Sequence, residues 1–236
     1  AIDNCISAAG YSVGEYAALV FAGALPFEPA VELVKIRAEA MQRASEMEPS
    51  GMMTVFLHPK SELGLACQAA KEYMRTELGH QNPVCQIAAN LFPECKVIAG
   101  HDQALQFIYD HAYKFNLYRR LKRLPVSGAF HTPLMEPALD QFQDALEVVS
   151  PQEPLISVLS NVDARPHRAG GPEMRKKLVK QVCRAVRWEQ ILHALYDRDH
   201  RAGFPFTYEV GPGNQLGQML RKTNLKAGNN FRHVAA

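Results

Sequence analysis

The run CISAAGYSVGEYAALVFAG, from Cys5 to Gly23, decides the fold. Its first residues are small or apolar and predict a short buried strand, Cys5 to Ala9, that ends at Gly10. The residues that follow Ser12 have helical composition, and Gly23 ends this helix. A strand that passes directly into a helix is the repeating unit of an α/β fold.

The turn between this strand and this helix, Gly10 to Gly14, matches the pattern G-x-S-x-G. We expect the two glycines to allow a sharp bend that presents the Ser12 hydroxyl at the carboxyl end of the sheet. The helix N-terminus and the N–H of Val13 could then stabilise an oxyanion. Ser12 is therefore the candidate nucleophile. The alternative, a small-residue turn with no chemistry, stays open because so short a pattern also arises by chance.

The rest of the chain divides into an inner and an outer part. Between about residues 52 and 126 the predicted order is β-α-β-β-α-β, with Ser61 as the expected cap of the first helix and a last strand at 120–126. This order is that of a ferredoxin-like unit, so we expect an inserted α+β subdomain over residues 51–126. In the outer part, predicted strands at 155–160 and 207–210 alternate with helices at 175–183, 188–196 and 215–221. This alternation predicts a parallel-sheet, α/β-hydrolase-like body formed by residues 1–50 and 127–236.

Composition and charge exclude several classes of protein. The 236 residues carry 26 basic and 24 acidic side chains, a net charge of +2, which argues against a dedicated nucleic-acid binder. The longest apolar stretch, Tyr16 to Leu25, is too short to span a membrane. The five cysteines form no C-x-x-C pair, so we expect no disulfide framework, no structural metal site and a reducing compartment.

Two segments are strongly basic. Residues 113–123 carry +5 with no acid, and residues 165–188 carry eight basic residues against Glu173, or +7. On an otherwise acidic molecule these segments suit an acidic partner. Two solvated faces are the alternative.

Two further residues complete a candidate site. His131 lies in a loop just before a helix that Thr132 caps and Pro133 begins, at the level expected for the end of a strand, and it can serve as the base for Ser12. We expect the other eight histidines to be surface residues. Arg37 lies among apolar residues of the helix predicted at 28–48, whose stripe includes Val31 and Ala38. It forms either a salt bridge with Glu32 or Glu39 or a bidentate clamp for a substrate carboxylate.

The assembled pattern resembles the malonyl-CoA:acyl-carrier-protein transacylases, and most closely the animal mitochondrial type. The resemblance covers nearly the whole chain and rests on seven blocks in order: GYSVGEYAALVFAGAL, VKIRAEAMQRA, PSGMMTV, VSGAFHTPLMEPA, SNVDA, VRWEQ and EVGPGNQLG. Several blocks in the right order are far more specific than G-x-S-x-G alone.

The resemblance implies a malonyl transfer from malonyl-CoA to the phosphopantetheine thiol of acyl carrier protein, in support of fatty acid synthesis. It implies Ser12 as the nucleophile, His131 as its base, Arg37 as the partner of the malonyl carboxylate, and the main-chain carbonyl of Gln181 as the group that orients His131. It also implies a monomer in the mitochondrial matrix that needs no cofactor. Members of the family carry a G-Q-G loop well before the nucleophile, so we expect that this sequence lacks the first βα segment and one oxyanion donor.

Two alternatives remain at this point. A serine thioesterase or other hydrolase would need an acid and then a histidine late in the chain, where His233 is the one candidate, and it would leave Arg37 without a role. An inactive, shortened relative could act as a carrier-protein-binding module.

Overall fold

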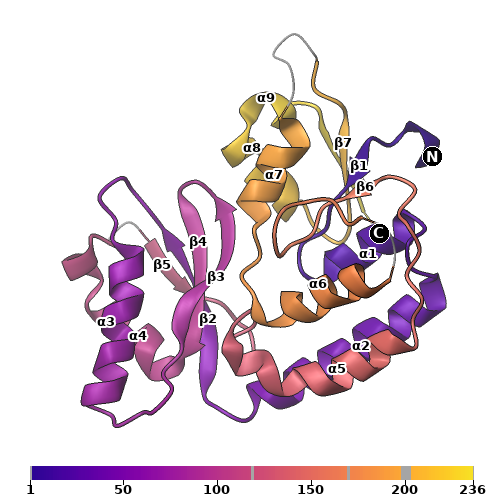
Figure 1. Ribbon diagram of the computed structural model, residues 1–236. Helices are drawn as coiled ribbons and strands as arrows, with labels where there is room; N and C mark the ends of the chain where they lie inside the picture. Colours follow the sequence, from indigo (N-terminus) through magenta and orange to yellow (C-terminus); the bar gives the residue numbers. More distant parts are fainter. Residues whose placement is uncertain (1, 118–119, 169–170, 198–202, 236) are drawn as a thin grey trace.

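The computed structural model describes residues 2–117, 120–168, 171–197 and 203–235, which form an antiparallel subdomain packed beside a larger α/β body (Figure 1). The chain enters the body, crosses into the subdomain, and returns to complete the body. The predicted fold class, a parallel-sheet α/β body with an inserted ferredoxin-like subdomain, is confirmed. The domain boundaries at 50/51 and 126/127 remain predictions. Within the described ranges, no helix is both long and apolar enough to cross a lipid bilayer.

The subdomain follows the predicted β-α-β-β-α-β order. Its elements are β2 (Ser50–Phe56), α3 (Leu63–Thr76), β3 (Cys85–Phe92), β4 (Cys95–His101), α4 (Asp102–Asp110) and β5 (Arg120–Arg123), with the 3₁₀ turn η2 (Ala112–Phe115) before β5. The strands form one antiparallel sheet in the order β3-β4-β2-β5. Alternation along β2 divides its side chains between two cores: Met53 and Val55 pack under α3 and α4, whereas Met52 faces the body.

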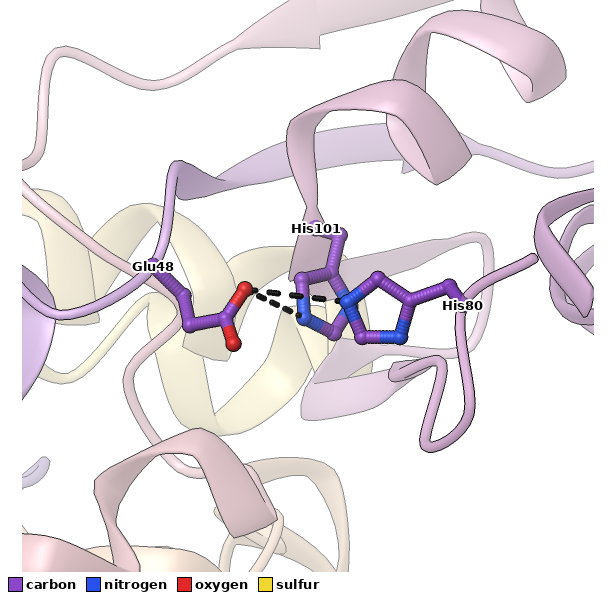
Figure 2. Close-up of side chains that lie close together, drawn as sticks. All are labelled: Glu48, His80 and His101. Carbon is purple, nitrogen blue, oxygen red and sulfur yellow. Dashed lines mark ion pairs between the residues drawn. The ribbon is translucent and has the colours of Figure 1, made fainter. Parts of the chain in front are cut away.

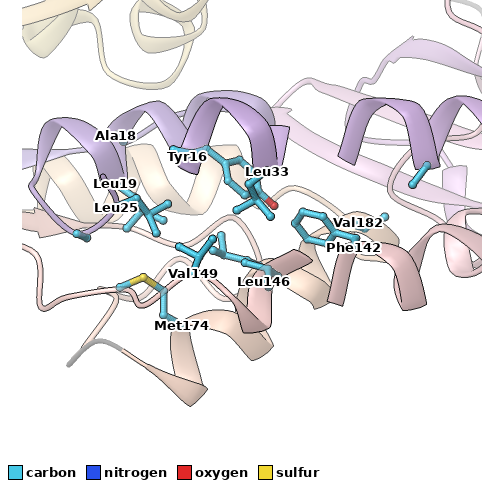
Figure 3. Close-up of a cluster of buried hydrophobic side chains, with 14 of the residues drawn as sticks. Tyr16, Ala18, Leu19, Leu25, Leu33, Phe142, Leu146, Val149, Met174 and Val182 are labelled. Carbon is cyan, nitrogen blue, oxygen red and sulfur yellow. The ribbon is translucent and has the colours of Figure 1, made fainter. Parts of the chain in front are cut away.

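The body holds the remaining elements. They are η1 (Ile2–Asn4), β1 (Ser7–Ala8), α1 (Val13–Phe21), α2 (Phe27–Ser45), η3 (Pro133–Ala138), α5 (Leu139–Glu147), β6 (Ser157–Val158), α6 (Pro172–Cys183), α7 (Trp188–Tyr196), β7 (Thr207–Val210), α8 (Gln215–Thr223), α9 (Leu225–Gly228) and β8 (Phe231–Val234). Among the described residues, its strands form two separate parallel pairs, β1 with β6 and β7 with β8. Figure 3 shows the core between α1, α2, α5 and α6, where Tyr16, Leu33, Phe142 and Leu146 are almost fully buried.

Several local predictions were wrong for identifiable reasons. The strand predicted over Cys5 to Ala9 is only Ser7–Ala8, and the strand predicted at 155–160 is only Ser157–Val158. Both are short because these two strands pair with each other over just two residues each. Strand β5 ends at Arg123 rather than at 126. Strand β8 and helix α9 were not predicted. The long helix expected after Thr132 begins as a 3₁₀ turn that contains Pro137, whose ring nitrogen has no N–H to donate.

Ser61 does not cap α3, because Glu62 occupies the cap position and the Ser61 hydroxyl donates instead to the Asn116 carbonyl over 2.8 Å. The buried stripe of α2 is also shifted from the predicted one. Val31 and Ala38 are exposed, and the buried positions include Leu33, Arg37 and Met41. Because residues four positions apart lie on the same face of a helix, Arg37 lies on the buried face of α2.

Candidate active site

The turn at Ser12 is strained. Ser12 has φ 51° and ψ −109°, outside the regions that non-glycine residues normally occupy. A Cβ on Gly10 would lie 1.8 Å from the Gly14 carbonyl oxygen, so no side chain fits there. A Cβ on Gly14 would meet nothing within 4 Å. The expectation that both glycines are needed for the bend was therefore wrong for Gly14: Gly10 permits the close approach, and the serine itself takes the unusual backbone conformation.

The side chain of Ser12 meets His131. The Ser12 Oγ lies 2.9 Å from the His131 Nε2, although the two residues are 119 positions apart in the chain. His131 comes from the loop between β5 and η3 and also has a positive φ, 63°. Thr132 fixes the following turn, since its hydroxyl donates to the Ala129 carbonyl at 2.6 Å and accepts from the Leu134 N–H at 3.3 Å. Backbone strain at both partners is typical of residues held for function.

A backbone carbonyl orients the imidazole of His131. Its Nδ1 lies 2.8 Å from the main-chain oxygen of Gln181 in α6, so the Nδ1 proton donates there and the Nε2 lone pair faces Ser12. Burial, and then the positive charge of Arg37, lower the pKa of His131 to about 4, against the hydrogen bond to Gln181, which raises it. The imidazole is therefore neutral near pH 7 and able to accept a proton.

Arg37 is the third member of the site and is 6% exposed. Its Nη2 donates to the Ser12 Oγ and to the Gln181 Oε1, both over 3.1 Å, and its guanidinium lies 5.5 Å from the centre of the Tyr16 ring. The structure shows no ion pair between Arg37 and any carboxylate of the residues that it describes. The salt bridge considered with Glu32 or Glu39 does not form, and Glu32 instead faces Lys35 at 3.7 Å. A buried guanidinium without an anion beside the nucleophile is suited to bind the carboxylate of a substrate.

Sequence reasoning assigned no role to Asn161, which follows β6 in the SNVDA block. Its Oδ1 accepts from the Ser12 N–H at 2.7 Å, and its Nδ2 donates to the Gly10 carbonyl at 2.8 Å. Asn161 thus holds the turn from both sides. The Val13 N–H, at the start of α1, has no hydrogen-bond acceptor among the described residues and remains available to an oxyanion.

Among the described residues, the expectation that all other histidines are surface residues was wrong for two of them, and His200 lies outside the described residues. His101 and His167 are 1% and 5% exposed. Neither would stand out from its neighbours in the sequence, because each is buried by partners distant in the chain: His101 by the loop after α3, and His167 by Glu15 of α1.

One cluster among the described residues has the spacing of a metal site: Glu48, His80 and His101 (Figure 2). The Glu48 Oε2 lies 3.7 Å from the His80 Nε2 and 3.4 Å from the His101 Nε2. However, the Val84 N–H donates to the Nδ1 of His101 over 3.0 Å. Burial and the neighbouring His80 lower the pKa of His101, which favours a neutral ring. A neutral ring that accepts at Nδ1 carries its proton on Nε2, so this nitrogen faces Glu48 as a donor and does not fit a metal ion.

The fold and this site define a class: α/β proteins in which a serine at a strand-to-helix turn is paired with a histidine. A scan against protein-family models gives no match. The chain is 50% identical over 233 residues to the human mitochondrial malonyl-CoA-acyl carrier protein transacylase. The aligned region covers 99% of this chain and 59% of that protein.

Solved structures give the same result. MCAT from Streptococcus pneumoniae is 32% identical, with a TM-score of 0.82 over 97% of this chain and 69% of that one. A type II PKS acyl-carrier protein in complex with its malonyl-transacylase matches with a TM-score of 0.78 at 27% identity, over 98% of this chain and 69% of that one. The chain belongs to the malonyl-CoA:acyl-carrier-protein transacylase family. It spans about three fifths of the length of the human relative.

Proposed function

We propose that this protein transfers a malonyl group from malonyl-CoA to the phosphopantetheine thiol of an acyl carrier protein, as part of fatty acid synthesis. The observation that carries the proposal is the meeting of three side chains: Ser12 Oγ lies 2.9 Å from the His131 Nε2 and 3.1 Å from the Arg37 Nη2. The first contact provides an activated nucleophile, and the second places a buried positive charge where the free carboxylate of a malonyl group would lie.

The reaction has two balanced halves. His131 Nε2 takes the Ser12 proton while Oγ attacks the thioester carbonyl of malonyl-CoA, and the oxyanion faces the free Val13 N–H. The C–S bond then breaks, and the CoA sulfur takes the proton from His131, which leaves a malonyl-serine ester. In the second half the carrier thiol gives its proton to His131 and attacks this ester, and the Ser12 oxygen recovers the proton as the C–O bond breaks.

Two observations favour this transfer over the thioesterase alternative. His131 is oriented by the Gln181 carbonyl and so needs no acid, and Arg37 has a position that simple ester hydrolysis would not require. His233, the late histidine a hydrolase would use, is exposed on β8 and faces the Gly211 carbonyl at 3.0 Å. The inactive-relative alternative is disfavoured because all three side chains meet in one site.

Each of the two basic segments offers exposed cations as a docking surface for an acidic carrier protein. Lys176 and Lys180 are exposed on α6, the helix that also carries Gln181. Arg120 and Lys122 are exposed on β5, whereas Arg123 is engaged with Asp102 at 2.9 Å. Arg119 belongs to the same basic segment but lies outside the described residues. We propose that these exposed cations raise the rate of encounter with the carrier.

The name of the human relative supports a mitochondrial location for this protein. We further propose that it acts as a monomer, without a cofactor of its own and without binding nucleic acid or a membrane, since the phosphopantetheine belongs to the carrier. Size-exclusion chromatography with light scattering tests the monomer.

Intact-protein mass spectrometry tests the proposed function. After separate incubation with malonyl-CoA and acetyl-CoA, we expect a malonyl-sized gain and a much smaller acetyl gain. The gain should be absent in Ser12→Ala. Subsequent addition of the carrier protein in its thiol form should return the enzyme to its original mass. A folded wild-type protein that gains no malonyl group would refute the proposal, and a gain that is released equally well without the carrier would support the hydrolase instead.

A further inference from the structure

Glu15 is a fully buried carboxylate that contacts residues of the site but takes no part in the reaction. Glu15 lies in the first turn of α1 and is 0% exposed. Its Oε1 lies 2.7 Å from the Nε2 of His167, and its Oε2 accepts from the Gln181 Nε2 at 2.6 Å and from the Asn161 N–H at 3.2 Å. Burying a carboxylate costs free energy unless hydrogen bonds compensate for the lost water, so the partners of Glu15 are essential to its position.

The two residues that share Oε2 are the two that hold the nucleophile. Asn161 accepts from the Ser12 N–H and donates to the Gly10 carbonyl. Gln181 donates from its side chain to the Ser12 carbonyl at 3.0 Å, and its main-chain oxygen holds His131. A single oxygen atom of Glu15, Oε2, is thus hydrogen-bonded to both residues that hold the Ser12 backbone, Asn161 and Gln181.

The carboxylate helps to decide which way the Gln181 amide faces, together with the Ser12 carbonyl, which accepts from the same Nε2. The Glu15 Oε2 accepts from the Gln181 Nε2, so the NH₂ of this amide faces the carboxylate. The amide oxygen is then left facing Arg37, whose Nη2 donates to it over 3.1 Å. A flipped amide would place its oxygen against the carboxylate and its NH₂ against the guanidinium. The orientation that Glu15 and the Ser12 carbonyl both favour is the one that holds Arg37 beside Ser12.

We propose that Glu15 is a positioning residue that fixes the Gln181 amide and thereby holds Arg37 in the geometry that selects a substrate with a free carboxylate. This inference rests on the proposed function. It assigns to Glu15 an effect on substrate selectivity that a purely structural buried residue does not have. Glu15 touches no reacting atom, so its removal leaves the Ser12 and His131 side chains present and lowers the preference for malonyl over acetyl groups.

The test compares the rate constants of Ser12 acylation by malonyl-CoA and by acetyl-CoA, measured by quenched-flow and intact mass and normalised to the folded fraction. In Glu15→Met, which has similar length and only a weakly accepting sulfur, we expect the malonyl-to-acetyl ratio to fall about tenfold or more, the effect of losing the hydrogen bond to Gln181. Glu15→Gln, which keeps an acceptor oxygen within reach, should retain most of the ratio. Leu146→Ala, a core substitution on α5, should lower stability and leave the ratio unchanged.

The outcomes separate the two proposals. If the wild-type protein takes no malonyl group, the proposed function fails and this inference fails with it. If the wild-type protein is acylated and the ratio in Glu15→Met stays within twofold of wild type, or falls equally in Leu146→Ala, the positioning role alone is refuted. If Glu15→Met does not fold, Glu15→Asp decides the matter, because it keeps a carboxyl group and shortens the reach to Gln181. An unchanged ratio in Glu15→Asp would then overturn the inference.

Discussion

Acid should destabilise this protein through His131. The pKa of His131 in the folded protein is lowered from 6.5 to about 4, first by burial and then by Arg37. Below about pH 6.5 the unfolded chain binds a proton at this residue, whereas the folded protein does not until about pH 4. Protons therefore favour the unfolded state between these two values. The stability that the neutral imidazole retains above about pH 6.5 is lost progressively as the pH falls toward about 4.

The linkage relation gives the size of this effect. Between about pH 7.5 and about pH 4.5, His131 alone should lower the free energy of unfolding by about 2.5 kcal/mol. Urea unfolding at the two pH values measures it, with fluorescence from the single tryptophan, Trp188, as the probe. Trp188 is 3% exposed and lies edge-on to Tyr11, with ring centres 5.8 Å apart, so its emission should change on unfolding.

The His131→Gln variant isolates this contribution from other groups that bind protons in acid, such as His101, whose pKa is also lowered by burial. The variant should lose about 2.5 kcal/mol less than the wild-type protein over the same pH interval. Equal acid dependence in the two proteins would show that His131 is not buried as a neutral base, which would refute its role as the base for Ser12.

Three further predictions concern the turn, the guanidinium and the docking surface. Gly10→Ala should abolish folding or acylation, because its Cβ would overlap the Gly14 carbonyl, whereas Gly14→Ala should fold normally and gain up to about 1 kcal/mol of stability from helix propensity. Circular dichroism and chemical unfolding measure both variants, and equal effects would refute the conclusion that Gly10 alone is needed for the close approach of the backbone. Arg37→Ala should lower the rate of malonyl acylation by about 100-fold or more and leave acetyl acylation within a few-fold, and equal losses would rule out the carboxylate clamp. Lys176→Glu should raise the KM for the carrier protein about threefold to tenfold at low salt and leave acylation by CoA thioesters unchanged. The control Lys35→Glu on α2 should not raise this KM, and a KM unchanged by Lys176→Glu would contradict docking at α6.

The elements that the sequence predicts well are those whose pattern is local. The turn Gly10 to Gly14 and the β-α-β-β-α-β order of the subdomain follow from hydrophobic periodicity and turn residues, and both are present in the structure. The lengths of β1 and β6 did not follow, because the extent of a strand depends on the partner that it finds. The buried stripe of α2 was displaced for a similar reason: composition indicates an apolar face, but the neighbouring α5 and η3 decide which residues it contains.

The candidate site shows the same division between local and distant information. Ser12, Arg37 and His131 carry local signals, namely a turn motif, a charge among apolar residues and a histidine before a helix cap. Asn161 and Glu15 carry none: an asparagine after a short strand and a glutamate in a first helical turn are both common on protein surfaces. Their roles arise only when chain segments about 150 residues apart meet, as in the contact of the Asn161 N–H with Glu15.

The strain at the site explains why such distant contacts are needed. Ser12 and His131 both have positive φ values, a conformation that costs on the order of 1–3 kcal/mol for each non-glycine residue. Neither residue would hold that conformation in a short peptide, so the surrounding structure must enforce it. The Ser12 backbone is fixed by Asn161 at its N–H and by Gln181 at its carbonyl, and both of these residues converge on Glu15. Asn161, Gln181 and Glu15 therefore supply the constraint that the G-x-S-x-G motif lacks: they hold the Ser12 backbone so that its hydroxyl lies 2.9 Å from His131 before any substrate binds.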